Sequence, residues 1–349
     1  MMKNRWIFWG ALCLLLVGLV VAMQRIHFDW GIFWRQLRSA DPLHLVLGVI
    51  CIYVGYILRA VRWSVFLRPQ KRVSPLTLIG TQVTGFTAVA LFGRLADPVR
   101  PYLVAKRVNL SVSSQLAVYA VERMFDALAM AIIFCSALLV SPDLGTLPHH
   151  DALIRSSWAG LAVAICGGAF AILTRTHGIK IAAAIGRSLQ SISPKFAAAA
   201  EARILSFRDG MNVLRSFGDF ISVLLLSLLM WALIILAYFE VVHAFSALSM
   251  LHSSRIMLVM AASMAGSILQ LPIIGWFTQI GLVSAAMKAL GAPLEPSIGA
   301  ASLLLLVTFM SVIPLGLIFA RLEHVSLREV TQESEHLVEG EMDTAPQES

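Results

Sequence analysis

The chain has 349 residues, of which 58% are hydrophobic and only 13% are charged, and its formal net charge is +7. An ordinary soluble domain carries about 25% charged residues, so this composition excludes one. The apolar residues come in blocks long enough to cross a bilayer, which takes about 20 residues per helix. We therefore expect an all-α membrane protein of several spans. Its basic excess is typical of cytoplasmic loops, and nucleic acid is not needed to explain it.

Six apolar stretches are long enough to be full membrane spans. The predicted spans are residues 6–23, 43–66, 115–140, 152–173, 219–245 and 295–320. The first follows Lys3 and Arg5 and lacks a cleavage pattern of small residues, so we interpret it as an uncleaved span.

Two further stretches, residues 76–107 and 256–290, are predicted to be re-entrant or broken. In the first, a Thr-rich apolar run is followed by a polar run, and in the second Pro272 and Gly275 interrupt the helix. A broken helix frees backbone groups that must be satisfied by protein or water. Full spans in place of re-entrant hairpins remain an alternative for residues 76–92 and 256–290.

The distribution of Lys and Arg predicts that both termini are cytoplasmic. Residues 174–217 form a basic connection that we expect to be a cytoplasmic loop, and residues 323–349 form an acidic tail that we expect to be disordered. In this topology each interrupted stretch is flanked by two full spans, once in each orientation. We hypothesise an inverted repeat, in which broken helices meet near the middle of the membrane, as in many transporters.

The most unusual stretch is Gly93–Arg100, because ionisable residues are costly among membrane segments. Arg94, Asp97 and Arg100 are spaced i, i+3, i+6, which on a helix would give one ridge of alternating charge, with Pro98 in its first turn. A guanidinium on such a ridge suits the oxygens of a phosphate.

The next predicted span carries Glu122, Arg123 and Asp126 in its first half. Glu122 and Asp126 are one helical turn apart and share a face. One interpretation is a polar site for a lipid head group. The other, which is compatible with it, is a buried salt-bridge network with Arg94 and Arg100.

Arg59 and Arg62 lie on one helical face at the end of the span 43–66. The simpler interpretation is that they snorkel to the cytoplasmic interface as a positive anchor. The alternative is contact with a lipid head group.

These motifs resemble the lysylphosphatidylglycerol synthase transmembrane-region family. The resemblance rests on Gly93-Arg94, Asp97 and Arg100, followed by Val121-Glu122-Arg123-Met124-Phe125-Asp126 and, late in the chain, Leu271-Pro272-Ile273-Ile274-Gly275. It covers roughly residues 6–320 and implies a flippase-like membrane protein, here without the large soluble synthase domain of some members. The candidate head-group residues are those charged side chains together with the pair on the second span: Arg94, Asp97, Arg100, Glu122, Arg123, Asp126, Arg59 and Arg62.

The chain departs from the family pattern at two places. Ala96-Asp97 stands where members commonly have Gly-Glu, and the region after Pro272 contains Gln279 but no acid between Glu240 and Glu295. A role for this half of the site in binding a cationic head group is therefore in doubt.

Translocation of a lipid or lipid-linked molecule across the cell membrane is the function that these features favour. The sequence contains no catalytic triad, HExxH, P-loop or metal cluster, so neither catalysis nor a metal or cofactor is expected. Two alternatives stay open. One is a membrane-embedded lipid or glycan transferase, with Glu122 or Asp126 as a base. The other is a non-catalytic subunit that recruits a cytoplasmic enzyme through residues 174–217 or the acidic tail.

Overall fold

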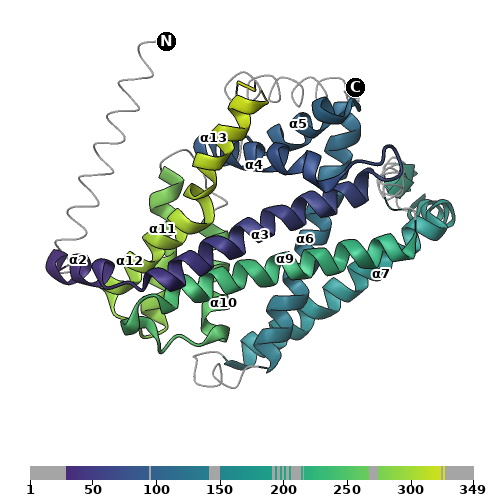
Figure 1. Cartoon of the computed structure of the whole chain (residues 1–349). Helices are drawn as coiled ribbons and strands as arrows, with labels where there is room; N and C mark the ends of the chain where they lie inside the picture. The colour runs from purple at the N-terminus through teal and green to yellow at the C-terminus, as the bar shows by residue number, and fades with distance from the viewer. Residues whose placement is uncertain are drawn as a thin grey trace, which may run out of the picture.

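The computed structural model describes residues 29–93, 96–140, 150–190, 216–266, 274–323 and 325–326, with isolated residues between 193 and 214. This part of the chain is helical and contains no strand, which confirms the predicted all-α membrane class. The helices are α2 (Trp30–Arg38), α3 (Pro42–Leu67), α4 (Pro75–Phe92), α5 (Val99–Val108), α6 (Val112–Val140), α7 (His150–Gln190), α9 (Phe217–His243), α10 (Ser253–Gly266), α11 (Ile274–Ala289), α12 (Leu294–Leu305) and α13 (Val312–Leu322), as Figure 1 shows.

Five helical stretches of the described residues are long and apolar enough to cross a membrane. They are Pro42–Leu67, Pro75–Phe92, Ile154–Thr174, Phe217–His243 and Leu294–Leu322. The predicted span 115–140 lies within the 29-residue helix α6, whose polar residues are considered below. The predicted span 6–23 and most of the acidic tail lie outside the described residues.

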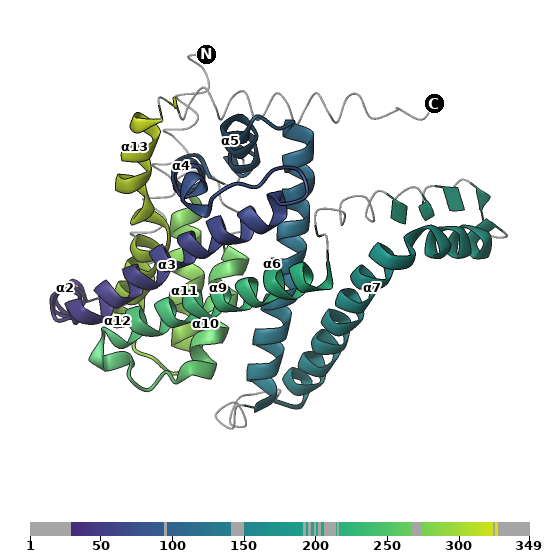
Figure 2. The same cartoon turned by 45° about the vertical axis from the view of Figure 1, so that its right-hand side comes forward.

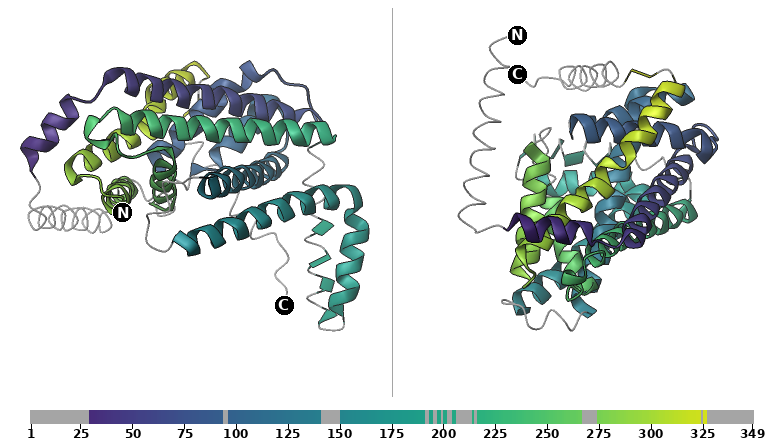
Figure 3. Two further views of the ribbon diagram at one scale, coloured as in Figure 1. Left: turned by 90° about the horizontal axis from the view of Figure 1, so that it is seen from below. Right: turned by 60° about the vertical axis from the view of Figure 1, so that its left-hand side comes forward.

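The basic connection begins as helix, because α7 continues past the predicted span end to Gln190, with non-helical backbone angles at His177. Figures 2 and 3 show the two parts of α7 set at an angle and lying along one side of the remaining helices. Most of residues 191–215 lie outside the described part of the chain.

Both interrupted stretches form helix pairs. Helix α4 ends at Phe92. Its C-cap, Gly93, has a φ of 82°, which glycine adopts easily but which is strained for other residues, and α5 begins at Val99. Helix α10 ends at Gly266 and α11 begins at Ile274. At about 1.5 Å per residue, α5, α10 and α11 are only about 15–24 Å long, which is shorter than the roughly 30 Å hydrocarbon core. Helix α4, with 18 residues, is long enough to cross.

The helices form two consecutive groups, which we call the two halves of the bundle. Within each half neighbouring elements are in contact, from α3 through α4 and α5 to α6, and from α9 through α10 and α11 to α12. Between the two groups α3 packs on α9, α6 on α9, and α4 on α13, with a smaller contact between α6 and α10. The inverted repeat stays a prediction.

Helices α3 and α9 run antiparallel side by side (Figures 1 and 3). At one end the backbone nitrogen of Asp41 donates to the carbonyl oxygen of Ala244 at 2.9 Å. At the other end Arg68 pairs with Asp219 at 3.3 Å. Local signals fix both helix starts: Asp41 caps α3 ahead of Pro42, and Ser216 and Asp219 form a capping box on α9. The first helices of the two halves therefore have opposite directions.

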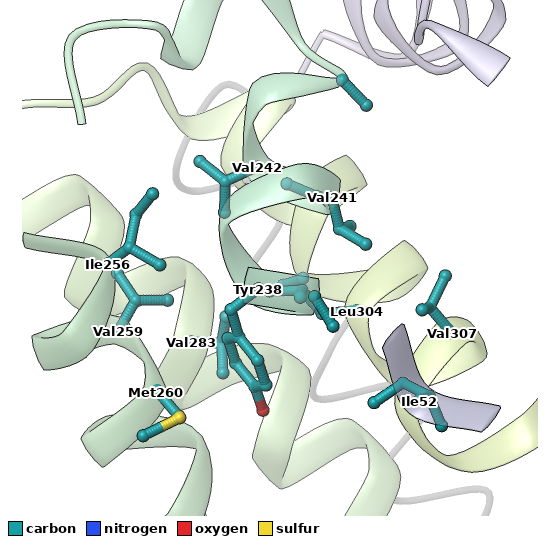
Figure 4. Close-up of a cluster of buried hydrophobic side chains, with 14 of the residues drawn as sticks. Ile52, Tyr238, Val241, Val242, Ile256, Val259, Met260, Val283, Leu304 and Val307 are labelled. Carbon is teal, nitrogen blue, oxygen red and sulfur yellow. The ribbon is translucent and has the colours of Figure 1, made fainter. Parts of the chain in front are cut away.

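The largest apolar cluster fills the space between α3, α9, α10, α11 and α12. Figure 4 shows Tyr238 of α9 in this cluster, between Met260 of α10 and Ile52 of α3. A second cluster surrounds Trp63 and Phe125 where α3, α6 and α9 meet. The two clusters together hold one face of α3 and of α9 against the remaining helices.

Candidate functional site

Glu122 of α6 is the centre of a buried polar cluster, and its side chain is 0% exposed. Arg62 of α3 donates to its Oε1 at 2.5 Å, and the indole nitrogen of the adjacent Trp63 donates to its Oε2 at 3.0 Å. Arg100 of α5 donates from one nitrogen to both oxygens, at 2.9 and 3.0 Å. A buried carboxylate needs such partners to offset its lost hydration, so Glu122 binds α3 and α5 to α6.

Asp126 lies one turn further along α6, and Arg62, which pairs with it, extends the cluster to α9. Arg62 donates from Nη1 to Asp126 at 2.6 Å and to the hydroxyl of Ser227, on α9, at 2.7 Å. The guanidinium of Arg62, which is 1% exposed, therefore contacts groups from α6 and α9 at once. Its planar fork of donors permits this, whereas a lysine ammonium would not match the geometry.

A glycine allows α5 to approach α4 closely enough for Arg100 to reach Glu122. A Cβ on Gly85 of α4 would lie 2.5 Å from the Cγ of Arg100 and 3.2 Å from its Cα. Arg100 also donates to the side-chain oxygen of Gln82 at 3.2 Å and lies 4.2 Å from the ring centre of Phe86. Hydrogen bonds and a cation–π contact thus position this guanidinium on α4.

Arg59 is the guanidinium of this buried group with the fewest hydrogen-bond partners. Its Nη1 is 3.8 Å from Glu122, too far for a hydrogen bond, and this buried atom has no hydrogen-bond partner among the described residues. The guanidinium lies 4.6 Å from the ring centre of Phe86, and the side chain is 11% exposed. Arg59 is therefore available to an additional anion.

A cavity of about 190 Å³ lies beside the cluster. We call Arg59, Asp97, Arg123 and Asp126 its charged wall. Trp231, Tyr238, Ser263 and Gln279, from α9, α10 and α11, form what we call its neutral wall. The rest of the lining is mostly apolar and includes Ile52, Val89, Met230, Ile234, Met260 and Phe309. The cavity is thus shared by the two halves of the bundle.

The cluster and the charged wall together carry one more positive than negative charge. The cations are Arg59, Arg62, Arg100 and Arg123, and the anions are Asp97, Glu122 and Asp126. Among the residues that the structure describes, no group of three or more His, Cys, Asp or Glu side chains is placed to hold a metal ion. The arrangement can bind an anion of one charge in a mostly apolar space.

The structure brings most of the predicted site residues together, but not as the predicted ridge. Helix α5 begins at Val99 with Pro98 as its N-cap, so Asp97 precedes the helix and the ridge with Arg100 does not form. Asp97 lines the cavity, whereas Arg94 lies outside the described residues. The predicted network is present between Arg100 and Glu122.

The snorkelling interpretation of Arg59 and Arg62 was wrong. Both side chains are directed into the bundle, where carboxylates and an aromatic ring surround them. Arg123 differs, because its side chain is 42% exposed; it lies 3.7 Å from Asp126 and over Tyr119 at 5.0 Å. Arg59 and Arg62 therefore face carboxylates on a neighbouring helix and do not extend to the membrane interface.

The residues predicted at the second helix break are partly described. Gly275 is buried in the first turn of α11, Gln279 lies one turn later on the cavity wall, and Pro272 lies outside the described residues. The side-chain nitrogen of Gln279 donates to the hydroxyl of Ser263 at 2.7 Å, and Tyr238 donates to the same hydroxyl at 2.7 Å.

The sequence did not predict several of the cavity residues. Trp231, Tyr238 and Ser263 lie inside apolar stretches with no local pattern that separates them from packing residues. Thr308 and Phe309 belong to a π-helical segment, Leu306–Met310, between α12 and α13. Such segments are frequent at functional sites. Pro314, which interrupts normal helix hydrogen bonding in the next turn, is the feature of the sequence that could have indicated this irregular segment.

Comparison with known proteins places this site in a family. A segment of 137 residues is 25% identical to the UPF0104 membrane protein of Methanothermobacter thermautotrophicus and covers 38% of this chain and 39% of that protein. A segment of 120 residues is 32% identical to the glycosyltransferase AglD of Haloferax volcanii and covers 34% of this chain and 19% of that protein. The chain thus spans well under half the length of these relatives in the matched segments. No solved structure matches it.

One family model covers nearly the whole helical bundle. The description of that family is lysylphosphatidylglycerol synthase TM region, and its model matches residues 8–316. The match includes α3 to α6 with the buried cluster and α9 to α12 with the neutral wall. This multi-pass membrane protein therefore belongs to the lysylphosphatidylglycerol synthase TM region family.

Proposed function

We propose that this protein translocates a lipid or lipid-linked molecule with an anionic head group across the cell membrane. The observation that carries the proposal is the cavity of about 190 Å³ between the two halves, with a charged wall and a largely apolar lining. A lipid needs a polar path for its head group while its chains stay in the bilayer. Broken helices that meet at such a cavity are the usual architecture for this task.

Arg59 is the group that we assign to the anion. Arg62 and Arg100 donate to Glu122 and Asp126 and do not line the cavity, although each also has a buried donor without a partner among the described residues. Arg59 does line the cavity, and its Nη1 has no hydrogen-bond partner among those residues. A guanidinium binds phosphate through two parallel hydrogen bonds. The single excess positive charge of the surroundings suits a phosphodiester.

The test is lipid movement between leaflets in vesicles that contain the purified protein. Arg59→Gln should slow the movement of a labelled anionic phospholipid at least about tenfold, since a hydrogen bond to a charged group contributes about 1.5–3 kcal/mol. The matched control is Arg155→Gln, because Arg155 is exposed on α7 and lies outside the cavity. Equal rates for wild type and Arg59→Gln, with both variants folded, would refute the assignment.

A second candidate is a membrane partner of glycan transfer. The observation that favours it is the 32% identity to a protein named as a glycosyltransferase, of which the chain covers 19%. In that case the purified protein would not move lipid by itself, and a transferase would co-purify in stoichiometric amount. Transfer of a labelled sugar by the purified chain alone would instead favour the transferase alternative.

A further inference from the structure

The neutral wall of the cavity carries hydrogen-bonding groups that the protein leaves unused. Tyr238 and Gln279 both donate to the hydroxyl oxygen of Ser263, each at 2.7 Å. The side-chain oxygen of Gln279 is buried and has no partner among the described residues, and the same holds for the indole nitrogen of Trp231. All four side chains line the cavity.

One side-chain amide atom of Gln279 has no partner among the described residues, whichever way the amide is oriented. If the amide is turned, its oxygen accepts from Ser263 and its nitrogen becomes the atom without a partner. Buried polar atoms in native proteins nearly always have a hydrogen-bond partner, so an unused pair on a cavity wall indicates a ligand or ordered water. A hydroxyl group can pair with either atom, because it both donates to a carbonyl oxygen and accepts from an N–H group.

This wall also lacks a negative charge. The whole stretch between Glu240 and Glu295 contains no Asp or Glu, and it supplies α10 and α11. Glu240 itself does not line the cavity and lies 2.6 Å from His44. The carboxylates that line the cavity, Asp97 and Asp126, belong to the charged wall, whose surroundings carry a net positive charge, and Arg62 and Arg123 face Asp126. An ammonium group placed against the neutral wall would therefore lose its hydration without gaining a counter-ion from that wall, which is unfavourable.

We infer that the neutral wall is a subsite for an uncharged, hydroxyl-bearing head group, glycerol or sugar, linked to the phosphate that Arg59 binds, and that it excludes cationic head groups. This inference rests on the proposed function. The volume of about 190 Å³ is below the roughly 300–1,000 Å³ of sites that enclose a whole drug-sized ligand. The site therefore suits a compact head group and leaves the acyl chains outside.

Binding of short-chain lipids to the full chain in detergent tests the subsite without requiring transport. The probes are phosphatidylglycerol, whose head group is neutral beyond the phosphate, and lysylphosphatidylglycerol, in which a cationic lysyl group is attached. Wild type should bind the first at least about tenfold more tightly, because the neutral wall supplies no counter-ion for the lysyl group and the four arginines beside the cavity repel it. Equal affinities would overturn the inference.

Two variants locate the effect on the neutral wall. Gln279→Glu is nearly isosteric and adds the missing charge, so it should raise the affinity for lysylphosphatidylglycerol relative to phosphatidylglycerol. Trp231→Phe keeps an aromatic ring but removes the N–H, so it should weaken phosphatidylglycerol binding several-fold. Unchanged affinities in both variants, with wild-type elution in size-exclusion chromatography, would also overturn the inference.

The same lipids in the vesicle assay separate the two proposals. Selective binding in detergent without movement between leaflets would refute translocation and leave the subsite intact. Movement of both lipids at the same rate, with equal binding, would refute the subsite and leave translocation intact.

Discussion

Arg100 donates from a single nitrogen to both carboxylate oxygens of Glu122, at 2.9 and 3.0 Å, and both side chains are fully buried. The pair joins α5, the short helix after the first break, to α6. A buried ion pair is stable only when its hydrogen bonds are well made, and removing one partner leaves an uncompensated charge. The cluster that surrounds the cavity is therefore also a structural element of the first half of the bundle.

Glu122→Gln should be strongly destabilising, by about 3–5 kcal/mol, because it removes the charge that faces the buried Arg62 and Arg100. The measurement is the apparent unfolding temperature in detergent and the yield of monodisperse protein. Asp151→Asn is the control, since Asp151 is exposed at the start of α7 and its change should have little effect. A wild-type unfolding temperature for Glu122→Gln would show that Glu122 does not hold these helices together.

Ser227→Ala should destabilise the fold by about 1.5–3 kcal/mol, because the fully buried hydroxyl accepts a hydrogen bond from the charged Arg62. Ser222→Ala on the same helix is a matched control. The hydroxyl of Ser222 is exposed and donates only to the carbonyl of Gly218, so its loss should change stability by less than about 0.5 kcal/mol. Urea unfolding of the two variants in detergent compares them, and equal effects would contradict the role of Ser227.

Gly316→Ala should separate α13 from α4. A Cβ on Gly316 would lie 1.7 Å from the hydroxyl oxygen of Thr87 and 2.6 Å from its Cβ, so the helices must move apart. Overpacking of this kind costs about 1–3 kcal/mol or more. In Gly281→Ala, where nothing lies within 4 Å of the new Cβ, the better helix propensity should instead stabilise by up to about 1 kcal/mol. Thermal unfolding should move in opposite directions for the two variants.

The antiparallel packing of α3 and α9 predicts the sidedness of two exposed serines. Ser113 follows α5 at the end of the bundle where Gln70 bonds Ser114, and Ser249 lies just past η3 (Ser246–Leu248) at the opposite end. In a variant without native cysteines, Ser113→Cys should react with an impermeant maleimide only from the cytoplasm, and Ser249→Cys only from outside. Reaction of both from one side would contradict the inverted arrangement.

Glu323, just past the end of α13, should make stability depend on pH. Burial raises the pKa of Glu323, and Arg107 at 3.7 Å opposes this only in part. Because the folded-state pKa is raised, the stabilising contribution is present below the ordinary pKa and is lost as pH rises through the raised value. The apparent unfolding temperature should therefore fall over the range above about pH 4.5 in wild type. Glu323→Gln should show a smaller fall, and an equal fall would exclude Glu323 as its source.

The sequence by itself determined the membrane class, most helix positions and the charged residues of the site. Apolar blocks of about 20 residues have no stable alternative to membrane helices. Caps such as Asp41-Pro42 and the turn at Gly93 depend on local backbone chemistry, which neighbouring residues specify. The shared face of Glu122 and Asp126 follows from the helical period alone. The apolar blocks and the shared face of Glu122 and Asp126 are local features, so the sequence pattern was sufficient to predict them.

Only the tertiary structure decided which charges pair and where the second wall of the cavity lies. Arg62 is 64 residues from Asp126 and 165 from Ser227, and no periodicity relates them. Helix α3 contacts both α6 and α9, and this packing brings Arg62 to Asp126 and Ser227. Because Arg62 is buried there, these groups compensate its charge. Likewise Trp231 and Gln279 meet the charged wall only because the two halves pack around one cavity. Long-range packing determines these partners, and the local sequence pattern does not predict that packing.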